Sequence, residues 1–137
     1  MRGARWTLAS LLLVVGCNSG GADDPEAELS GSYVGDELVV NGQATALVAG
    51  TEIRLEVAGG RLTLSAGCNA ISADVEVLES SLRIAEREKT AMGCAPDRSA
   101  QDDLLVRLVD SSPAYDLTED GLQLSGDGIV VALSAAP

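Results

Sequence analysis

The sequence contains no histidine and very few aromatic residues: of its 137 residues, only Trp6, Tyr33 and Tyr115 are aromatic. Without histidine the chain can build neither a Ser-His-Asp triad nor a Cys-His pair, and it has no imidazole to bind a metal. The scarcity of aromatic rings argues against sugar binding and against base stacking, which use an aromatic platform. No Gly-x-x-x-x-Gly-Lys-Ser/Thr or Gly-x-Gly-x-x-Gly sequence is present, so neither kind of phosphate-binding loop is available.

Basic residues are also few: nine Lys and Arg stand against 21 Asp and Glu, and the formal net charge is −12. A chain this acidic repels a phosphate backbone, and no stretch combines a basic stripe with interleaved aromatic residues. We therefore expect no nucleic-acid partner and no electrostatic docking onto anionic lipids.

The acidic residues form no recognisable catalytic or metal-binding pattern. No window has the alternating acids, the glycine and the final glutamate of an EF-hand. We interpret Glu119, Asp120 and Asp127 as solvated turn residues, and Asp102 and Asp103 as solvated residues on a helix surface. No two acids stand out as a pair for hydrolysis. We therefore expect no catalytic residues, no metal and no cofactor, and predict that the protein is not an enzyme.

The N-terminus has the pattern of an export signal. Arg2 and Arg5 precede an apolar run over residues 6–15, which is too short for a membrane span of about 20 residues. Val14-Val15-Gly16-Cys17 resembles the bacterial lipobox, which implies cleavage before Cys17 and lipidation of its thiol. Residues 1–16 are then the lipoprotein signal peptide. The alternatives are an ordinary secretory signal with an incidental cysteine, and a buried N-terminal helix.

The residues after Cys17 are small, polar and acidic, so we predict a lipidated flexible tether over residues 17–28. In a cell with two membranes, Asn18 in place of aspartate favours the outer membrane, facing the periplasm. Residues 29–137 would form one domain with one core, and we expect a monomer. Removal of residues 1–16 takes away two basic and no acidic residues, which moves the net charge from −12 to −14. Membrane contact should therefore come from the acyl chains.

Three cysteines leave two after lipidation of Cys17. In an exported chain, Cys68 and Cys94 would form a disulfide and close a loop of about 27 residues, worth roughly 3–4 kcal/mol. A redox-active pair is the alternative. A reactive thiol needs a cation, a helix N-terminus or a Cys-x-x-Cys arrangement, and only Lys89 and Arg98 lie near Cys94 in the sequence.

Most of the remaining sequence alternates between apolar and polar residues, as in half-buried strands. A glycine pair at residues 59–60 predicts a hairpin turn, and the charged run at residues 86–89 predicts a bulge or a strand end. The predicted strands cover residues 33–40, 53–57, 62–66, 71–77, 82–84, 115–117, 122–124 and 129–133.

A single helix is predicted between these strands. Asp97 is its expected N-cap, and residues 111–113 end it. Its apolar residues recur at helical spacing: Leu104, Leu105, Leu108 and Val109. The fold class is therefore mainly β: a small antiparallel β-barrel or strongly curved sheet of about eight strands, with one α-helix.

Two motifs in this pattern resemble those of the META domain, found in HslJ-like heat-shock lipoproteins. They are Gly67-Cys68-Asn69 and, about 20 residues later, Thr90-x-Met92-x-Cys94. The resemblance implies a barrel-like β fold with one helix, a bridged cysteine pair, no established enzymatic activity and a loose association with envelope stress.

The chain departs from the family pattern where members often carry aromatic residues. Here Ile71, Ala73 and Val75 follow the first motif, and Tyr33 stands where members usually have tryptophan. Aliphatic residues can replace the aromatic ones if these only pack.

The polar motif residues also have structural interpretations. We interpret Asn69 as a turn residue bonded to its own backbone, Thr90 as a bridge between strands, and Met92 as a core residue. A small recognition site at Asn69 and Thr90 is the alternative.

We therefore expect a non-enzymatic, lipid-anchored protein of the cell envelope, acting as an accessory in envelope stress or as an interaction module with an envelope protein as partner. One alternative is a carrier that binds a small apolar ligand inside the barrel, which needs a cavity of about 300 Å³ or more. A thiol enzyme is the other.

Overall fold

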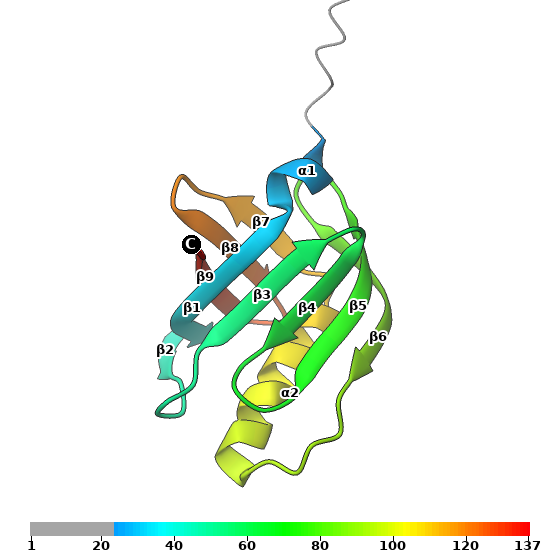
Figure 1. Ribbon diagram of the computed structural model, residues 1–137. Coiled ribbons are helices and arrows are strands. Elements are labelled where there is room, and N and C mark those ends of the chain that lie inside the picture. Colours follow the sequence, from blue (N-terminus) through cyan, green and yellow to red (C-terminus); the bar gives the residue numbers. More distant parts are fainter. Residues whose placement is uncertain (1–23) are drawn as a thin grey trace, which may run out of the picture.

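A computed structural model describes residues 24–137 of the chain (Figure 1). The helices are α1 (Pro25–Leu29) and α2 (Pro96–Asp110). The strands are β1 (Gly31–Val40), β2 (Gln43–Ala46), β3 (Ile53–Ala58), β4 (Arg61–Ser65), β5 (Ala70–Val77), β6 (Leu82–Lys89), β7 (Ala114–Leu117), β8 (Gly121–Gly126) and β9 (Ile129–Ala135).

The strands form one antiparallel, strongly curved sheet in the order β6-β5-β4-β3-β1-β9-β8-β7, and β2 pairs with β1 off this path (Figure 1). The predicted fold class, mainly β with about eight strands in a curved antiparallel sheet, is confirmed. The first strand, β1, lies in the middle of the sheet and pairs with both β3 and the last strand, β9. The first and last strands are therefore paired in the centre of the sheet.

The two edge strands of the sheet, β6 and β7, meet at the α1 end. An isolated bridge joins Ser81 to Ala114, the Leu82 amide donates to the Pro113 carbonyl at 2.9 Å, and the Tyr115 amide donates to the Ser80 carbonyl at 3.1 Å. Helix α2 follows β6 and packs against β4, β6 and β8. The sheet is thus closed by backbone hydrogen bonds at one end and by a helix toward the other.

Alternation along β3, β4 and β5 places every second residue in the core. The predicted hairpin is confirmed: Ala58 pairs with Arg61 across Gly59 and Gly60, which have φ of +57° and +74°. Such angles favour glycine. The buried residues of these strands are Ile53, Leu55, Val57, Leu62, Leu64, Ile71, Ala73 and Val75.

The core is a single cluster of mostly aliphatic side chains. From α2, Leu105, Leu108 and Val109 enter it, while Leu104 is half-buried. From α1, Leu29 enters it. Because full burial of one such side chain contributes about 1.5–3 kcal/mol, this aliphatic cluster is the main stabilising element.

The helix boundaries differ from those predicted. Ala95 is the N-cap of α2 and Pro96 its first residue, so Asp97 is not the N-cap. The ring of proline presets a helical φ, and the helix starts two residues earlier than predicted. Helix α1 was not predicted, and it takes residues 25–28 out of the predicted tether. Asp24 caps it by accepting a hydrogen bond from the Glu26 amide at 3.1 Å. Within residues 24–137, neither helix is long and apolar enough to cross a membrane.

The expected irregularity in the charged run at residues 86–89 is a bulge within β6. Glu86 has φ of +51°, and the register between β5 and β6 shifts between Ser72 and Asp74. Glu86, Arg87, Glu88 and Lys89 are all exposed in this part of β6.

Candidate functional site: the disulfide and its buried polar partners

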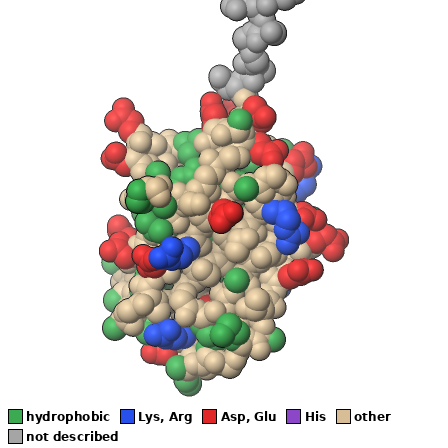
Figure 2. Space-filling model, in the orientation of Figure 1, with side chains coloured by type: hydrophobic (Ala, Val, Ile, Leu, Met, Phe, Trp, Pro, Cys, Tyr) green, Lys and Arg blue, Asp and Glu red, His purple; other side chains and the backbone are tan. Residues whose placement is uncertain are grey.

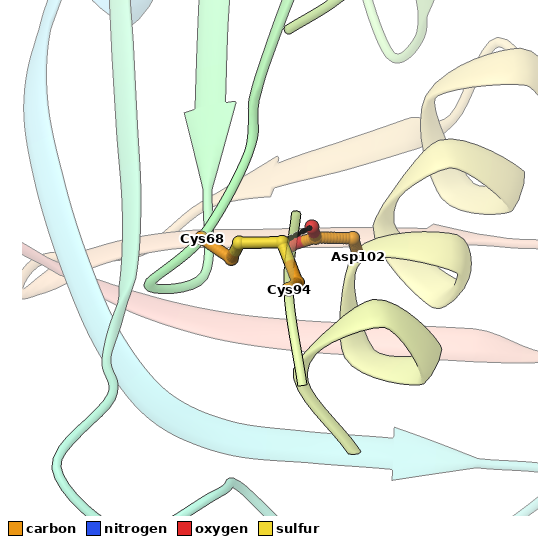
Figure 3. Close-up of side chains that lie close together, drawn as sticks. All are labelled: Cys68, Cys94 and Asp102. Carbon is orange, nitrogen blue, oxygen red and sulfur yellow. Dashed lines mark hydrogen bonds between the residues drawn. A yellow bond between two sulfur atoms is a disulfide. The ribbon is translucent and has the colours of Figure 1, made fainter. Parts of the chain in front are cut away.

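The cysteines of the two sequence motifs are joined. Cys68 lies in the loop between β4 and β5, Cys94 lies between β6 and α2, and a disulfide connects them with 6.2 Å between their Cα atoms (Figure 3). Both cysteines are half-buried. The predicted pairing is therefore present in the structure, whereas Cys17, the predicted lipidation site, lies outside the described residues.

Asn69 is the centre of a buried hydrogen-bond network beside the disulfide. Its Oδ1 accepts from the Thr90 hydroxyl at 2.9 Å and from the Met92 amide at 2.8 Å. Its Nδ2 donates to Asp102 Oδ2 at 3.0 Å and to Cys94 Sγ at 3.2 Å, and its backbone amide donates to the same Asp102 oxygen at 3.1 Å. The side chain thus binds distant segments, and the prediction that it bonds its own backbone is wrong.

Thr90 joins two segments of the sheet, as predicted. Its hydroxyl accepts from the Ala70 amide at 3.0 Å, and its own amide donates to the Ala70 carbonyl at 3.0 Å. Met92, in contrast, is 63% exposed, so its prediction as a core residue is wrong. Met92 contributes its backbone amide to the network, while its side chain points to solvent.

Asp102 was predicted to be a solvated helix residue but is buried, with 1% of its surface exposed. Its side chain projects from α2 toward the disulfide, and Oδ2 lies 3.8 Å from Cys94 Sγ (Figure 3). The other oxygen, Oδ1, is buried and has no hydrogen-bond partner. A signal was available in the sequence, because Asp102 precedes Leu105 by three residues and so extends the apolar stripe of the helix by one turn.

Gln101 is a second buried polar residue of α2 that sequence reasoning missed. Its Nε2 donates to the Ala66 carbonyl at 2.8 Å and to the Thr51 hydroxyl at 3.0 Å, and its Oε1 accepts from the Val48 amide at 2.9 Å. It therefore fixes the loop between β2 and β3, and the end of β4, against the helix.

Steric crowding explains why the first motif has glycine at position 67. Gly67 has φ of +93°, and a Cβ there would lie 2.6 Å from Thr51 Cγ2, too close for any larger residue. Its carbonyl accepts from Arg98 Nη1 at 3.1 Å, which ties the turn to the first turn of α2.

The sequence of this chain matches the model of a known protein family. The family model of the META domain matches residues 27–137, which is most of the chain and all of the sheet. The chain belongs to the META domain family. The predicted resemblance is thereby confirmed, and the family match begins two residues before the predicted domain start at residue 29.

Two solved structures share the fold of this META domain. One is described as the NMR structure of the protein from Burkholderia xenovorans: it has a TM-score of 0.64 and 19% identity, over 85% of this chain and 92% of that one. The other, described as an NMR structure of the protein, has a TM-score of 0.62 and 19% identity, over 82% and 94% of the two chains. A search of curated proteins gave no match. At this identity the likeness establishes the fold alone.

The positions at which this META domain lacks aromatic residues are core positions. Ile71 and Ala73 are fully buried, and Val75 is 7% exposed. Aliphatic packing therefore occupies the place of the aromatic cluster, as expected if such side chains only fill space.

The basic groups of the META domain are largely paired with acids. Five of the seven Lys and Arg residues in 24–137 form ion pairs with carboxylates. Figure 2 shows acidic and basic side chains interspersed over one face, with hydrophobic side chains in small separate areas. This face therefore offers no continuous basic surface for an anionic polymer.

Proposed function

We propose that this protein is an exported, lipid-anchored protein of the cell envelope, whose META domain is a non-enzymatic accessory or interaction module. The observation that carries the proposal is the pairing of Cys68 with Cys94. Of the three cysteines, this leaves Cys17, which directly follows the short apolar run of the predicted signal peptide. Its thiol is then the one available for lipidation.

The arrangement of the domain suits an anchor at the N-terminus. Helix α1 lies at one end of the curved sheet, and the start of α2, beside the disulfide, lies at the opposite end (Figure 1). Seven residues, 17–23, separate the proposed lipid from Asp24, and such a segment reaches at most about 25 Å when fully extended. The anchored domain would turn its disulfide end away from the membrane.

The buried polar groups support a role without catalysis. The three buried polar side chains of residues 24–137 are Asn69, Gln101 and Asp102, and their hydrogen bonds hold segments of the fold together. Pairing of most arginines with carboxylates supports the exclusion of nucleic acid as a partner. We propose that the domain is monomeric and that its partner is another envelope protein.

The alternative carrier function has less support. The side chains that face the interior form one packed cluster. A hollow of about 430 Å³ on the surface beside β1 and β9 is lined by four carboxylates, which are unsuited to an apolar ligand: Asp36, Glu37, Glu52 and Asp120.

The anchoring proposal is tested by membrane fractionation of cells that express the full chain. Cys17→Ala should move the protein from the membrane to the soluble fraction, and mass spectrometry of the parent should find acyl chains on Cys17. The matched control is Cys68→Ala with Cys94→Ala. This variant keeps Cys17, so it should remain at the membrane whether or not its domain folds. A Cys17→Ala protein that stays in the membrane fraction contradicts the proposal.

The interaction proposal is tested by crosslinking the lipidated protein in its own envelope and identifying what is captured. We expect an envelope protein that is absent when Cys17→Ala displaces the domain. Turnover of a small molecule by the purified protein would instead contradict the non-enzymatic role.

A further inference from the structure

The disulfide end of the molecule holds three groups that metals bind. The ligand atoms of Cys68, Cys94 and Asp102 all lie within 4.8 Å of one another. We propose that reduction of the disulfide converts this cluster into a site for a thiophilic divalent cation such as Zn²⁺, with two thiolates and one carboxylate as ligands. The proposal does not depend on lipid anchoring.

The carboxylate of Asp102 is already buried and only partly satisfied. Oδ2 accepts two hydrogen bonds from Asn69, whereas Oδ1 has no partner. The oxygen that lies 3.8 Å from Cys94 Sγ is Oδ2, and a cation bound there would also offset the cost of burying a carboxylate whose other oxygen is unpaired. This unpaired oxygen is the feature that the structural role of the disulfide leaves unexplained.

The spacing between one sulfur and the carboxylate oxygen is close to that of a tetrahedral site. Zinc bonds of about 2.3 Å to sulfur and about 2.0–2.2 Å to oxygen place the two ligand atoms roughly 3.5 Å apart. In the disulfide form, Cys94 Sγ and Asp102 Oδ2 are 3.8 Å apart. The Cα atoms of Cys68 and Cys94, 6.2 Å apart, leave room for the sulfur atoms to separate by rotation of their side chains.

Neighbouring groups would orient and balance the site. Asn69 Nδ2 donates to both Cys94 Sγ and Asp102 Oδ2, so one amide fixes a sulfur and an oxygen ligand together. Hydrogen bonds of this kind orient metal ligands and strengthen binding. Two thiolates, a carboxylate and a divalent cation leave one negative charge, and the guanidinium of Arg98 lies next to the Cys68 turn, on the Gly67 carbonyl.

The chemistry requires an external dithiol as reductant. The dithiol gives two electrons and two protons to the disulfide, so that its own sulfurs become a disulfide and Cys68 and Cys94 become thiols. Binding of the cation then displaces the two thiol protons to solvent. Thiolate ligands select Zn²⁺ and similar cations over Ca²⁺ and Mg²⁺, which prefer oxygen. The oxidised protein, whose sulfurs are bonded to each other, should not bind the cation.

The test uses Cys17→Ala full-length protein, which has no third thiol, and Cd²⁺ as a spectroscopic probe of thiolate ligands. After reduction with a dithiol and its removal without air, titration should give the sulfur-to-metal charge-transfer absorption with one Cd²⁺ per chain. Zn²⁺ should abolish the signal by competition, and protein kept oxidised should give none. Binding by the oxidised form, no binding by the reduced form, or one cation per two chains would each overturn the proposal.

The contribution of the carboxylate is tested by Asp102→Asn. Because loss of an outer-shell partner already costs about 10- to 100-fold in affinity, loss of this ligand should weaken binding at least as much. The matched control is Asp103→Asn, whose exposed neighbouring side chain should leave the affinity unchanged. Circular dichroism of both oxidised variants should give the spectrum of the parent, which checks that they are folded. Equal affinity of the two variants would remove Asp102 from the site and overturn the three-ligand proposal.

Discussion

The two ends of this META domain are closed in different ways. At the α1 end, β6 and β7 meet through backbone hydrogen bonds, and Tyr115 of β7 donates to the carbonyls of Leu78 and Glu79, just before β6. The Tyr33 hydroxyl of β1 donates to the Leu29 carbonyl of α1 at 2.8 Å. At the other end, the closure is a disulfide and the buried side chains of Asn69, Gln101 and Asp102. At the α1 end, where strands pair through their backbones, the additional bonds come from tyrosine hydroxyls. At the other end, where loops and a helix are held together, a disulfide and a buried carboxylate take the place of strand pairing.

The largest effect should follow from loss of the disulfide, because it crosslinks residues 26 apart in the sequence. In a Cys17→Ala background, Cys68→Ala with Cys94→Ala should lower the free energy of unfolding by about 3–4 kcal/mol, through the greater entropy of the unfolded chain. Urea denaturation measures the change. The single Cys17→Ala protein is the control, and equal midpoints for the two proteins would show that the bridge does not stabilise this end.

The next largest effect should come from Asn69→Ala, which leaves Asp102, Thr90 and the Met92 amide without their shared partner. Hydrogen bonds to a charged, buried group make the cost about 2–3 kcal/mol. The control is Gln43→Ala on the exposed β2 strand, which should change stability by less than about 0.5 kcal/mol. A similar small loss for both variants would contradict the central role of Asn69.

A backbone test compares two glycines of the motif segments. In Gly67→Ala, alanine must adopt a positive φ and its Cβ lies against Thr51. The free energy of unfolding should fall by about 1–3 kcal/mol. Gly93→Ala meets no atom within 4 Å and should be nearly neutral. Thermal unfolding of both variants, followed by circular dichroism, measures the difference. Equal melting temperatures would mean that the turn adapts, and that the steric explanation for Gly67 is wrong.

At the α1 end, Tyr115→Phe should cost only about 0.5–1.5 kcal/mol, the net value of a neutral hydrogen bond. The backbone bonds at the edges of β6 and β7 remain in this variant. Chemical denaturation of Tyr115→Phe and Asn69→Ala under the same conditions compares their losses in the free energy of unfolding. A loss larger than that of Asn69→Ala would reverse the contrast between the two ends.

The smallest effect is a loss of stability in alkaline solution. Burial raises the pKa of Tyr33 above 10.0, and burial followed by the charges of Glu28 and Glu79 raises the pKa of Tyr115. The unfolded chain therefore ionises first, so this contribution is complete below about pH 10 and is lost as pH rises through the folded pKa values. Denaturation midpoints measured on both sides of pH 10 should fall less for Tyr33→Phe with Tyr115→Phe than for the parent.

The sequence predicted well what depends on repeated patterns. Alternation located eight of the nine described strands but not β2, the glycine pair at residues 59–60 located a hairpin, and the cysteine count with the two motifs predicted the Cys68–Cys94 disulfide. The sequence-based prediction failed where a single tertiary contact determines whether a residue is buried. Loops fold back over Gln101 and Asp102 and bury them. The helical spacing places Asp102 on the buried face, but its carboxylate favoured a solvated interpretation, and no local pattern reports the loop contacts of Gln101. Helix α1 was missed because it is short and is held by the capping bond of Asp24 and the burial of Leu29.

The pairing of β1 with β9 also sets an order of events. The first strand cannot complete its hydrogen bonds until the last strand, which ends at Ala135, has been made. At about 5–20 residues per second, synthesis of the stretch from Gly31 to Ala135 takes roughly 5–20 s. Throughout that time β1 lacks one neighbour, so the sheet cannot be complete until β9 has been synthesised.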